Sequence, residues 1–197
     1  MPRPSRLTEK RRELLPALAR AFVELGYRRA TTAELAARCD VQENILYRLW
    51  PDKKAMFLAA IDYVYEFSEQ TWMRLLAGEK TGGNGALRLL EFESKHQGEF
   101  GHYRIIFSGL GETDDAEIRD ALRRLFARFH RFLLAQILAQ RESDSRRNGI
   151  EADRIAWAMI GVGTIVNVGR ELGMLNDGER KRLIGDVGRE LLAERAL

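Results

Sequence analysis

Four side chains suited to hydrogen bonding with nucleic-acid bases lie close together in the first quarter of the chain. They are Gln42, Glu43, Asn44 and Arg48. On a helix placed in the major groove of DNA, amides suit adenine, a guanidinium suits guanine, and a carboxylate can accept from cytosine N4. Val41 and Leu46 are predicted to point into a core, which leaves the four polar side chains facing outward. The chemistry that this pattern predicts is the reading of base edges.

Two short helices separated by a tight turn are predicted to position these side chains. The first covers about residues 32–38 and the second about residues 42–50. Pro51 ends the second helix, because proline cannot continue a helix interior. Glu34 stands three residues after Thr31, which is the spacing of a capping box at the start of the first helix.

The three residues between these helices have the length of a helix-turn-helix connection. Asp40 lies in this turn, and aspartate tolerates a left-handed backbone better than most residues do. Cys39 is predicted to be a small buried hydrophobe of the motif and not a nucleophile.

The surrounding residues carry a resemblance to a known family. They are residues 21–27 (AFVELGY), residues 31–36 (TTAELA), Val41, Leu46, Tyr47 and residues 50–53 (WPDK). With this spacing the chain resembles the DNA-binding domain of the TetR family of transcriptional regulators. The resemblance implies a helix-turn-helix domain over residues 1–52 and a helical effector-binding and dimerisation domain over residues 53–197.

The resemblance also implies roles for single residues in binding double-stranded operator DNA. Thr31, Tyr47 and Lys53 are expected to contact phosphates. The side chains expected to face the bases are Gln42, Glu43, Asn44 and Arg48.

Composition limits the classes of protein that the chain can represent. With 45% hydrophobic and 31% charged residues, the chain has the composition of a soluble globular protein. A single cysteine excludes a disulfide framework and favours a reducing, cytoplasmic location. The basic N-terminus lacks the apolar segment of a signal peptide. The longest apolar stretch, residues 155–169, is too short to cross a membrane.

Positive charge is concentrated at the N-terminal end. Residues 1–54 hold 12 Lys/Arg and 7 Asp/Glu, whereas the remainder of the chain is slightly acidic. The most basic stretch contains Arg3, Arg6, Lys10, Arg11 and Arg12. By itself such a stretch is usually a solvated tail. Beside a recognition helix, an arm that contacts phosphates becomes the favoured interpretation.

Helical periodicity continues through the rest of the chain, and no long strand-like alternation interrupts it. Besides the two short helices, we predict helices over residues 7–25, 53–77, 86–97, 103–109, 115–141, 151–175 and 177–195. Loops are predicted at residues 80–85 and 141–149. The predicted fold is all-α, with an N-terminal three-helix DNA-binding domain followed by a C-terminal helical bundle for ligand binding and dimerisation.

The predicted helix over residues 151–175 is rich in glycine, and its stretch over residues 155–169 is apolar on nearly all sides. Gly161, Gly163, Gly169 and Gly173 each cost about 1 kcal/mol of helix propensity relative to alanine. Close approach of another helix would offset that cost, either within the chain or across a dimer. The family resemblance favours a homodimer through the last two helices.

One pattern suggests a different class of protein. Glu93 and His96, and again Glu99 and His102, have the Glu-x-x-His spacing of di-iron helix bundles. The two motifs are too close together for that architecture, where they lie on separate long helices. A helical-bundle metalloenzyme, or a small-molecule carrier with a vestigial DNA-binding domain, is therefore the alternative hypothesis.

The favoured hypothesis is a transcriptional regulator, a repressor that a small effector releases from its operator. We expect no catalytic residue, no metal and no cofactor, and no membrane partner. Aromatic residues of the C-terminal part are either core or the lining of a ligand cavity. They are Trp72, Phe92, Tyr103, Phe107, Phe126, Phe129 and Trp157. Their abundance suggests a hydrophobic or aromatic effector of unknown identity.

Overall fold

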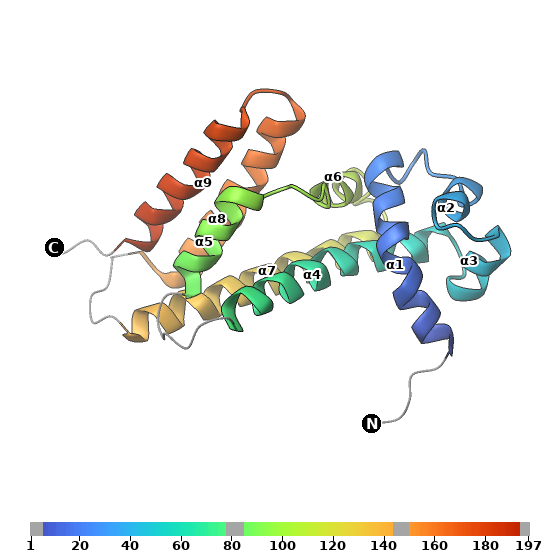
Figure 1. Cartoon of the computed structure of the whole chain (residues 1–197), viewed down its shortest axis with the longest axis horizontal. Coiled ribbons are helices and arrows are strands. Elements are labelled where there is room, and N and C mark those ends of the chain that lie inside the picture. Colours follow the sequence, from blue (N-terminus) through green and yellow to red (C-terminus); the bar gives the residue numbers. More distant parts are fainter. Residues whose placement is uncertain (1–5, 78–84, 144–149, 194–197) are drawn as a thin grey trace. The chain divides into compact units, whose positions relative to one another are not determined.

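The computed structural model of the protein describes residues 6–77, 85–143 and 150–193. Within these ranges the chain forms nine α-helices and no strand, which confirms the all-α prediction (Figure 1). The helices are α1 (Arg6–Leu25), α2 (Thr32–Arg38), α3 (Glu43–Leu49), α4 (Lys53–Ala77), α5 (Gly85–His96), α6 (Tyr103–Leu110), α7 (Ala116–Ser143), α8 (Ala152–Glu171) and α9 (Asp177–Leu192).

Most predicted helix boundaries agree with the structure to within one or two residues, but α8 is shorter than predicted. It ends at Glu171 because Gly173 adopts a left-handed backbone, with φ of 65°. The N–H of Met174 then donates to the carbonyl of Gly169 at 2.8 Å, which closes the helix end. Of the predicted loops at 80–85 and 141–149, residues 80–84 and 144–149 lie outside the described residues, whereas residue 85 begins α5 and residues 141–143 belong to α7. The last helix is also shorter than predicted, because the backbone turns to an extended conformation at Ala193 and α9 ends at Leu192.

The chain divides into two compact units, and the first contains the predicted helix-turn-helix. This unit comprises the residues up to Phe67 and residues Phe100–Leu125. Its fully buried side chains include Leu18, Phe22, Leu35, Leu46 and Phe57. Burying each of these contributes about 1.5–3 kcal/mol. The rings of Phe22 and Phe57 meet edge to face at 5.1 Å, which joins α1 to the first turns of α4.

The second unit comprises residues Ser68–Glu99 and Phe126–Leu197. Helix α9 packs against both α5 and α8, and Figure 1 shows α8 and α9 antiparallel. Their core includes Leu90, Ile155, Val166 and Ile184. Gly188 of α9 lies directly against the side chain of Leu90, where a β-carbon would collide. One of the glycines in the last two helices therefore serves an internal crossing.

The boundary between these units does not follow the predicted domain division at residue 52/53. Both α4 and α7 continue from one unit into the other, and α6 belongs with the N-terminal helices. The physical reason is packing of α6 against α1, where the N–H of Tyr27 donates to Oγ of Ser108 at 2.9 Å. A functional division at residue 52/53 remains a prediction.

Candidate nucleic-acid interface

The first helix of the predicted helix-turn-helix is held by a capping box. The N–H of Glu34 donates to Oγ1 of Thr31 at 3.2 Å, and the N–H of Thr31 donates to Oε2 of Glu34 at 2.9 Å. The backbone N–H groups of Thr31 and Glu34 have no acceptor within α2, and the capping box supplies one for each, as the spacing of these residues predicted. The hydroxyl of Thr31, which donates to Oε2 of Glu34 at 2.7 Å, and the N–H of Thr31 together hold the pKa of Glu34 below its ordinary value. Thr31 is consequently a structural cap as well as a predicted phosphate ligand.

The turn between α2 and α3 has the predicted left-handed residue. Asp40 adopts φ of 52°, the single positive φ outside glycine among the described residues. The N–H of Val41 then donates to the carbonyl of Ala36 at 3.1 Å, so the chain doubles back and α3 packs on α2. Cys39 is buried, as predicted for a small hydrophobic residue of the motif. Burial also raises the pKa of its thiol.

Helix α3 has one buried and one exposed face. Leu46 and Leu49 are buried against the other helices of the unit. The four predicted base-reading side chains are all exposed and lie at the start and on the outer face of α3: Gln42, Glu43, Asn44 and Arg48. Their predicted orientation is thus correct, whereas their contact with bases remains a prediction.

Two hydroxyl groups meet beside this exposed face. The hydroxyl of Tyr47 lies 3.1 Å from Oγ1 of Thr32, and half of the Tyr47 side chain is exposed. This pair joins the start of α2 to the middle of α3. Thr32 was not among the predicted site residues, because its contact is made across the turn and leaves no spacing signal along the sequence.

Lys53, predicted to contact a phosphate, is engaged within the protein. Its Nζ donates to the carbonyls of Tyr27 and Ala30, each at 3.0 Å, and lies 4.8 Å from the centre of the Tyr27 ring. Two of the three ammonium protons are therefore used to join the start of α4 to the turn before α2. The structure gives Lys53 a positioning role that the sequence did not reveal.

Part of the predicted basic arm also has partners within the protein. Nε of Arg11 donates to the carbonyl of Leu49 at 2.6 Å, at the C-terminal end of α3. A cation there satisfies an orphan carbonyl and complements the helix dipole. Lys10 pairs with Glu13 at 2.7 Å. Arg3 lies outside the described residues.

Acidic residues before and at the start of α7 form ion pairs with basic residues of the same unit. Nζ of Lys54 lies 2.5 Å from Oε1 of Glu117 and 3.2 Å from Oδ2 of Asp115, and these hydrogen bonds raise the pKa of Lys54. Arg28 lies 2.5 Å from Glu112. The turn before α2 and the start of α4 are therefore both held to the residues that precede or begin α7.

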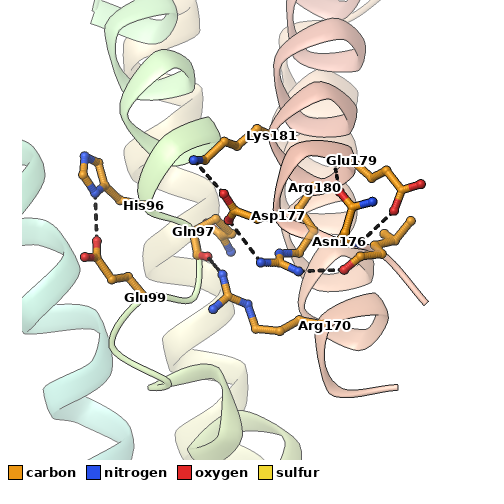
Figure 2. Close-up of polar contacts among 10 residues, drawn as sticks. His96, Gln97, Glu99, Arg170, Asn176, Asp177, Glu179, Arg180 and Lys181 are labelled. Atoms are coloured by element: carbon orange, nitrogen blue, oxygen red, sulfur yellow. Dashed lines mark hydrogen bonds and ion pairs between the residues drawn. The ribbon is translucent and has the colours of Figure 1, made fainter. Parts of the chain in front are cut away.

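In the second unit, hydrogen bonds around the turn from α8 to α9 set how α5, α8 and α9 meet (Figure 2). Arg170 donates to the carbonyl of Gln97 at 2.7 Å, so the end of α8 is joined to the end of α5. Arg180 donates to the carbonyl of Leu175 at 2.6 Å. Asn176 and Glu179 form a second capping box, at the start of α9.

This turn also accounts for two glycines that were predicted to serve close helix approach. A β-carbon on Gly169 would collide with the side chain of Leu175, and Gly173 holds the left-handed position. Both residues therefore shape the local turn. Gly161 differs from them, because a β-carbon there would meet nothing within 4 Å.

The aromatic residues that the sequence left as either core or ligand lining have different surroundings. Trp72 is buried and its ring lies 5.6 Å from that of Phe129, whereas Trp157 is half exposed and stacks on His130. Tyr103 and Phe107 pair with each other in the first unit.

The alternative metal site finds no support in the part of the chain that the structure describes. No group of three or more potential metal ligands occurs there. His96 instead pairs with Glu99 at 2.8 Å, and Figure 2 shows the two side chains pointing toward each other. The carboxylate of Glu93 accepts a hydrogen bond from the indole of Trp72. None of the helices in the described ranges combines the length and apolar character that a membrane crossing requires.

Comparisons with known proteins agree with this geometry. Residues 14–60 match the family model described as bacterial regulatory proteins, tetR family. The nucleoid occlusion factor SlmA of Vibrio campbellii is 30% identical over 161 residues, which cover 79% of this chain and 80% of that relative.

Two solved structures share the fold at 16% identity. A transcriptional regulator from Saccharomonospora viridis in complex with choline has a TM-score of 0.76, covering 91% of this chain and 95% of that one. A TetR family regulator from Cytophaga hutchinsonii has a TM-score of 0.78, covering 97% and 96%.

Replacing Lys53 by methionine should separate its positioning role from its charge. Two partly buried carbonyls would lose their donor, so the free energy of unfolding should fall by about 1–3 kcal/mol. Arg48→Met is the matched control, and on the exposed face it should change stability by less than about 0.5 kcal/mol. Urea denaturation measures both. Equal stability of the two variants would contradict the positioning role.

Proposed function

The chain belongs to the tetR family of bacterial regulatory proteins, and we propose that it is a dimeric repressor that a small effector releases from operator DNA. The family match and the SlmA relative support a DNA-binding regulator over the metalloenzyme and carrier hypothesis. The observation that carries the proposal is the face of α3, where exposed hydrogen-bonding side chains lie over a buried apolar face. We further propose that the protein acts in the cytoplasm, where the chromosome of a bacterium lies.

In the proposed complex α3 enters the major groove, and the surrounding side chains contact the DNA backbone. Thr31, Tyr47 and Lys53 contact phosphates, and the hydroxyl pair of Thr32 and Tyr47 fixes the direction of the tyrosine. Lys53 has one ammonium proton left for a phosphate after its two carbonyl bonds. Phosphate contacts position the protein, whereas base contacts select the sequence.

Replacing Arg48 by alanine should relax base preference at one position of the operator. Loss of a guanidinium that pairs with guanine costs about 1–3 kcal/mol at that base pair and little elsewhere. Selection of binding sites from random duplexes measures this. Arg20→Ala is the control, because Arg20 is an exposed cation of α1 in the same basic segment. Uniformly weaker binding of every duplex by Arg48→Ala would show that Arg48 contacts phosphates.

The proposed dimer uses the exposed apolar side of α8. Trp157, Ile165 and Leu172 are about half exposed or more, and Gly161 lies between them in the same helical register. Steps of four and seven residues place these positions on one face. An apolar face of this kind suits a second copy of the same chain, and open space at Gly161 allows close helix approach. Two half-sites one helical turn apart would require such a dimer.

Replacing Ile165 by arginine should convert the dimer to a monomer, because a charge would be buried at the centre of this face. Sedimentation velocity measures the oligomeric state. Affinity for an operator with two half-sites should fall by about 100-fold or more, since the two contacts are no longer linked. Leu110→Arg, at an exposed apolar residue of α6, is the matched control and should stay dimeric. A dimeric Ile165→Arg variant would place the interface elsewhere.

The effector is proposed to bind among the helices after the DNA-binding domain and to be hydrophobic or aromatic. The choline complex of the Saccharomonospora viridis regulator supports a small-molecule ligand for this fold. Helix α4 runs without interruption from Lys53 beside the turn before α2 to the buried Trp72. A continuous helix can shift as a unit, and the coupling between effector and DNA must be reciprocal.

A role in nucleoid occlusion is the second candidate. The relative from Vibrio campbellii covers both domains at 30% identity, well beyond the helix-turn-helix alone. If this candidate is correct, a strain lacking the protein should form division septa across its chromosome, counted by fluorescence microscopy. Normal septum placement, together with altered transcription of genes beside the binding sites, would favour the repressor.

A further inference from the structure

Ile45 is an apolar side chain at one border of the exposed face of α3. It is partly exposed, whereas Leu46 and Leu49 of the same helix are buried, so the core covers only part of it. Successive residues are about 100° apart around a helix axis. Ile45 therefore lies beside the exposed Arg48, three residues further along, and on the border opposite to Tyr47, whose hydroxyl meets α2.

Ile45 also belongs to the part of α3 that would lie nearest to the bases. In helix-turn-helix proteins the N-terminal residues of the second helix contact base edges. Helix α3 begins at Glu43, and the N–H of Ile45 donates to the carbonyl of Gln42 at 2.9 Å, which places Ile45 in the first turn. A side chain without any hydrogen-bonding group thus stands among side chains that can hydrogen-bond to bases.

The chemistry of the major groove leaves one class of partner for such a side chain. Most groups that bases display there are polar: N7 and O6 of guanine, N7 and N6 of adenine, N4 of cytosine and O4 of thymine. An isoleucine against one of these groups would displace water without replacing its hydrogen bond, which costs free energy. Against the C5-methyl group of thymine, the isoleucine would instead remove apolar surface from water on both sides of the contact. The base 5-methylcytosine carries a methyl group at the same ring position.

We propose that Ile45 is a specificity-determining residue that packs against the C5-methyl group of a pyrimidine, either thymine or 5-methylcytosine. This inference rests on the proposed contact of α3 with bases and adds a chemical class of base to it. Side chains three residues apart on a helix lie about 5–6 Å from each other, and successive bases are about 3.4 Å apart. The methylated pyrimidine should therefore lie within about two base pairs of the guanine that Arg48 reads.

Replacement of thymine by deoxyuridine tests this contact, because uracil lacks only the C5-methyl group. Duplexes are first selected from a random pool with the wild-type protein, and each thymine of a selected duplex is then replaced in turn. Fluorescence anisotropy measures each affinity. One thymine in each half-site should be sensitive, with a loss of about fourfold per half-site, as expected of one buried methyl group.

The outcome separates this contact from the proposed function. If a duplex is selected but none of its thymines is sensitive, the inference is overturned while the DNA-binding regulator stands. Failure to select any duplex would contradict the proposed contact of α3 with bases, and the inference with it.

Variants at position 45 test whether this residue reads the methyl group. With Ile45→Ala, thymine and uracil at the sensitive position should bind equally, while the other positions of the operator keep their preferences. Ile45→Gln keeps the length of the side chain but makes it polar, and should lose the methyl preference as well. Ile106→Ala is the matched control, because Ile106 is a partly exposed isoleucine of α6 in the same unit, and it should keep the full preference. Melting curves check that the variants fold. A methyl preference that survives in both variants of Ile45 would assign the contact to another residue.

A cytosine series distinguishes the two sources of the methyl group. The sensitive T·A pair is replaced by a C·G pair that carries either cytosine or 5-methylcytosine. If the methyl group itself is recognised, 5-methylcytosine should bind about fourfold more tightly than cytosine, and Ile45→Ala should abolish the difference. Operator affinity would then respond to methylation of cytosine at this position. Equal binding of the two bases would overturn this extension to methylated DNA and confine the contact to thymine.

Discussion

The carbonyls of Tyr27 and Ala30 converge on the ammonium of Lys53, and the arrangement of the N-terminal unit depends on this contact. It holds the start of α4 to the turn from which α2 begins. The packing of Phe22 and Tyr27 on Phe57 reinforces the same junction with apolar contacts. Because the junction is both hydrogen-bonded and packed, a shift of α4 would carry the helix-turn-helix with it. The regulatory hypothesis depends on this property.

The reading face of α3 is a consequence of what the other side of the helix buries. Leu46 and Leu49 enter the core, and Arg11 satisfies the carbonyl at the end of the helix. Three constraints thus orient a helix of seven residues, which would be unstable by itself. Exposed polar side chains gain a defined direction from this support, and a defined direction is what base recognition requires.

The two units use charge in different ways. In the first, cations are paired with carbonyls or with carboxylates before and at the start of α7, so their role is largely positional. In the second, Glu93 has an indole as its hydrogen-bond donor and aromatic rings nearby. The Glu93 carboxyl group is partly buried, and its hydrogen bond from Trp72 joins α5 to α4.

Much of this protein was determined by local sequence. The capping box at Thr31 and Glu34, the left-handed Asp40, the buried Cys39 and the outward face of α3 follow from spacing within a few residues, and the structure agrees with each. Helix positions were predictable for the same reason.

The tertiary structure decided what depends on residues far apart in the chain. Lys53 meets Tyr27, Arg11 meets Leu49, and Trp72 meets Glu93 only because helices cross, and no periodicity encodes such crossings. The roles of the glycines were decided in the same way, since Gly188 serves an internal crossing and Gly173 a turn, whereas Gly161 faces open space. Local propensity sets where helices form, and the packing of distant side chains sets what each residue does.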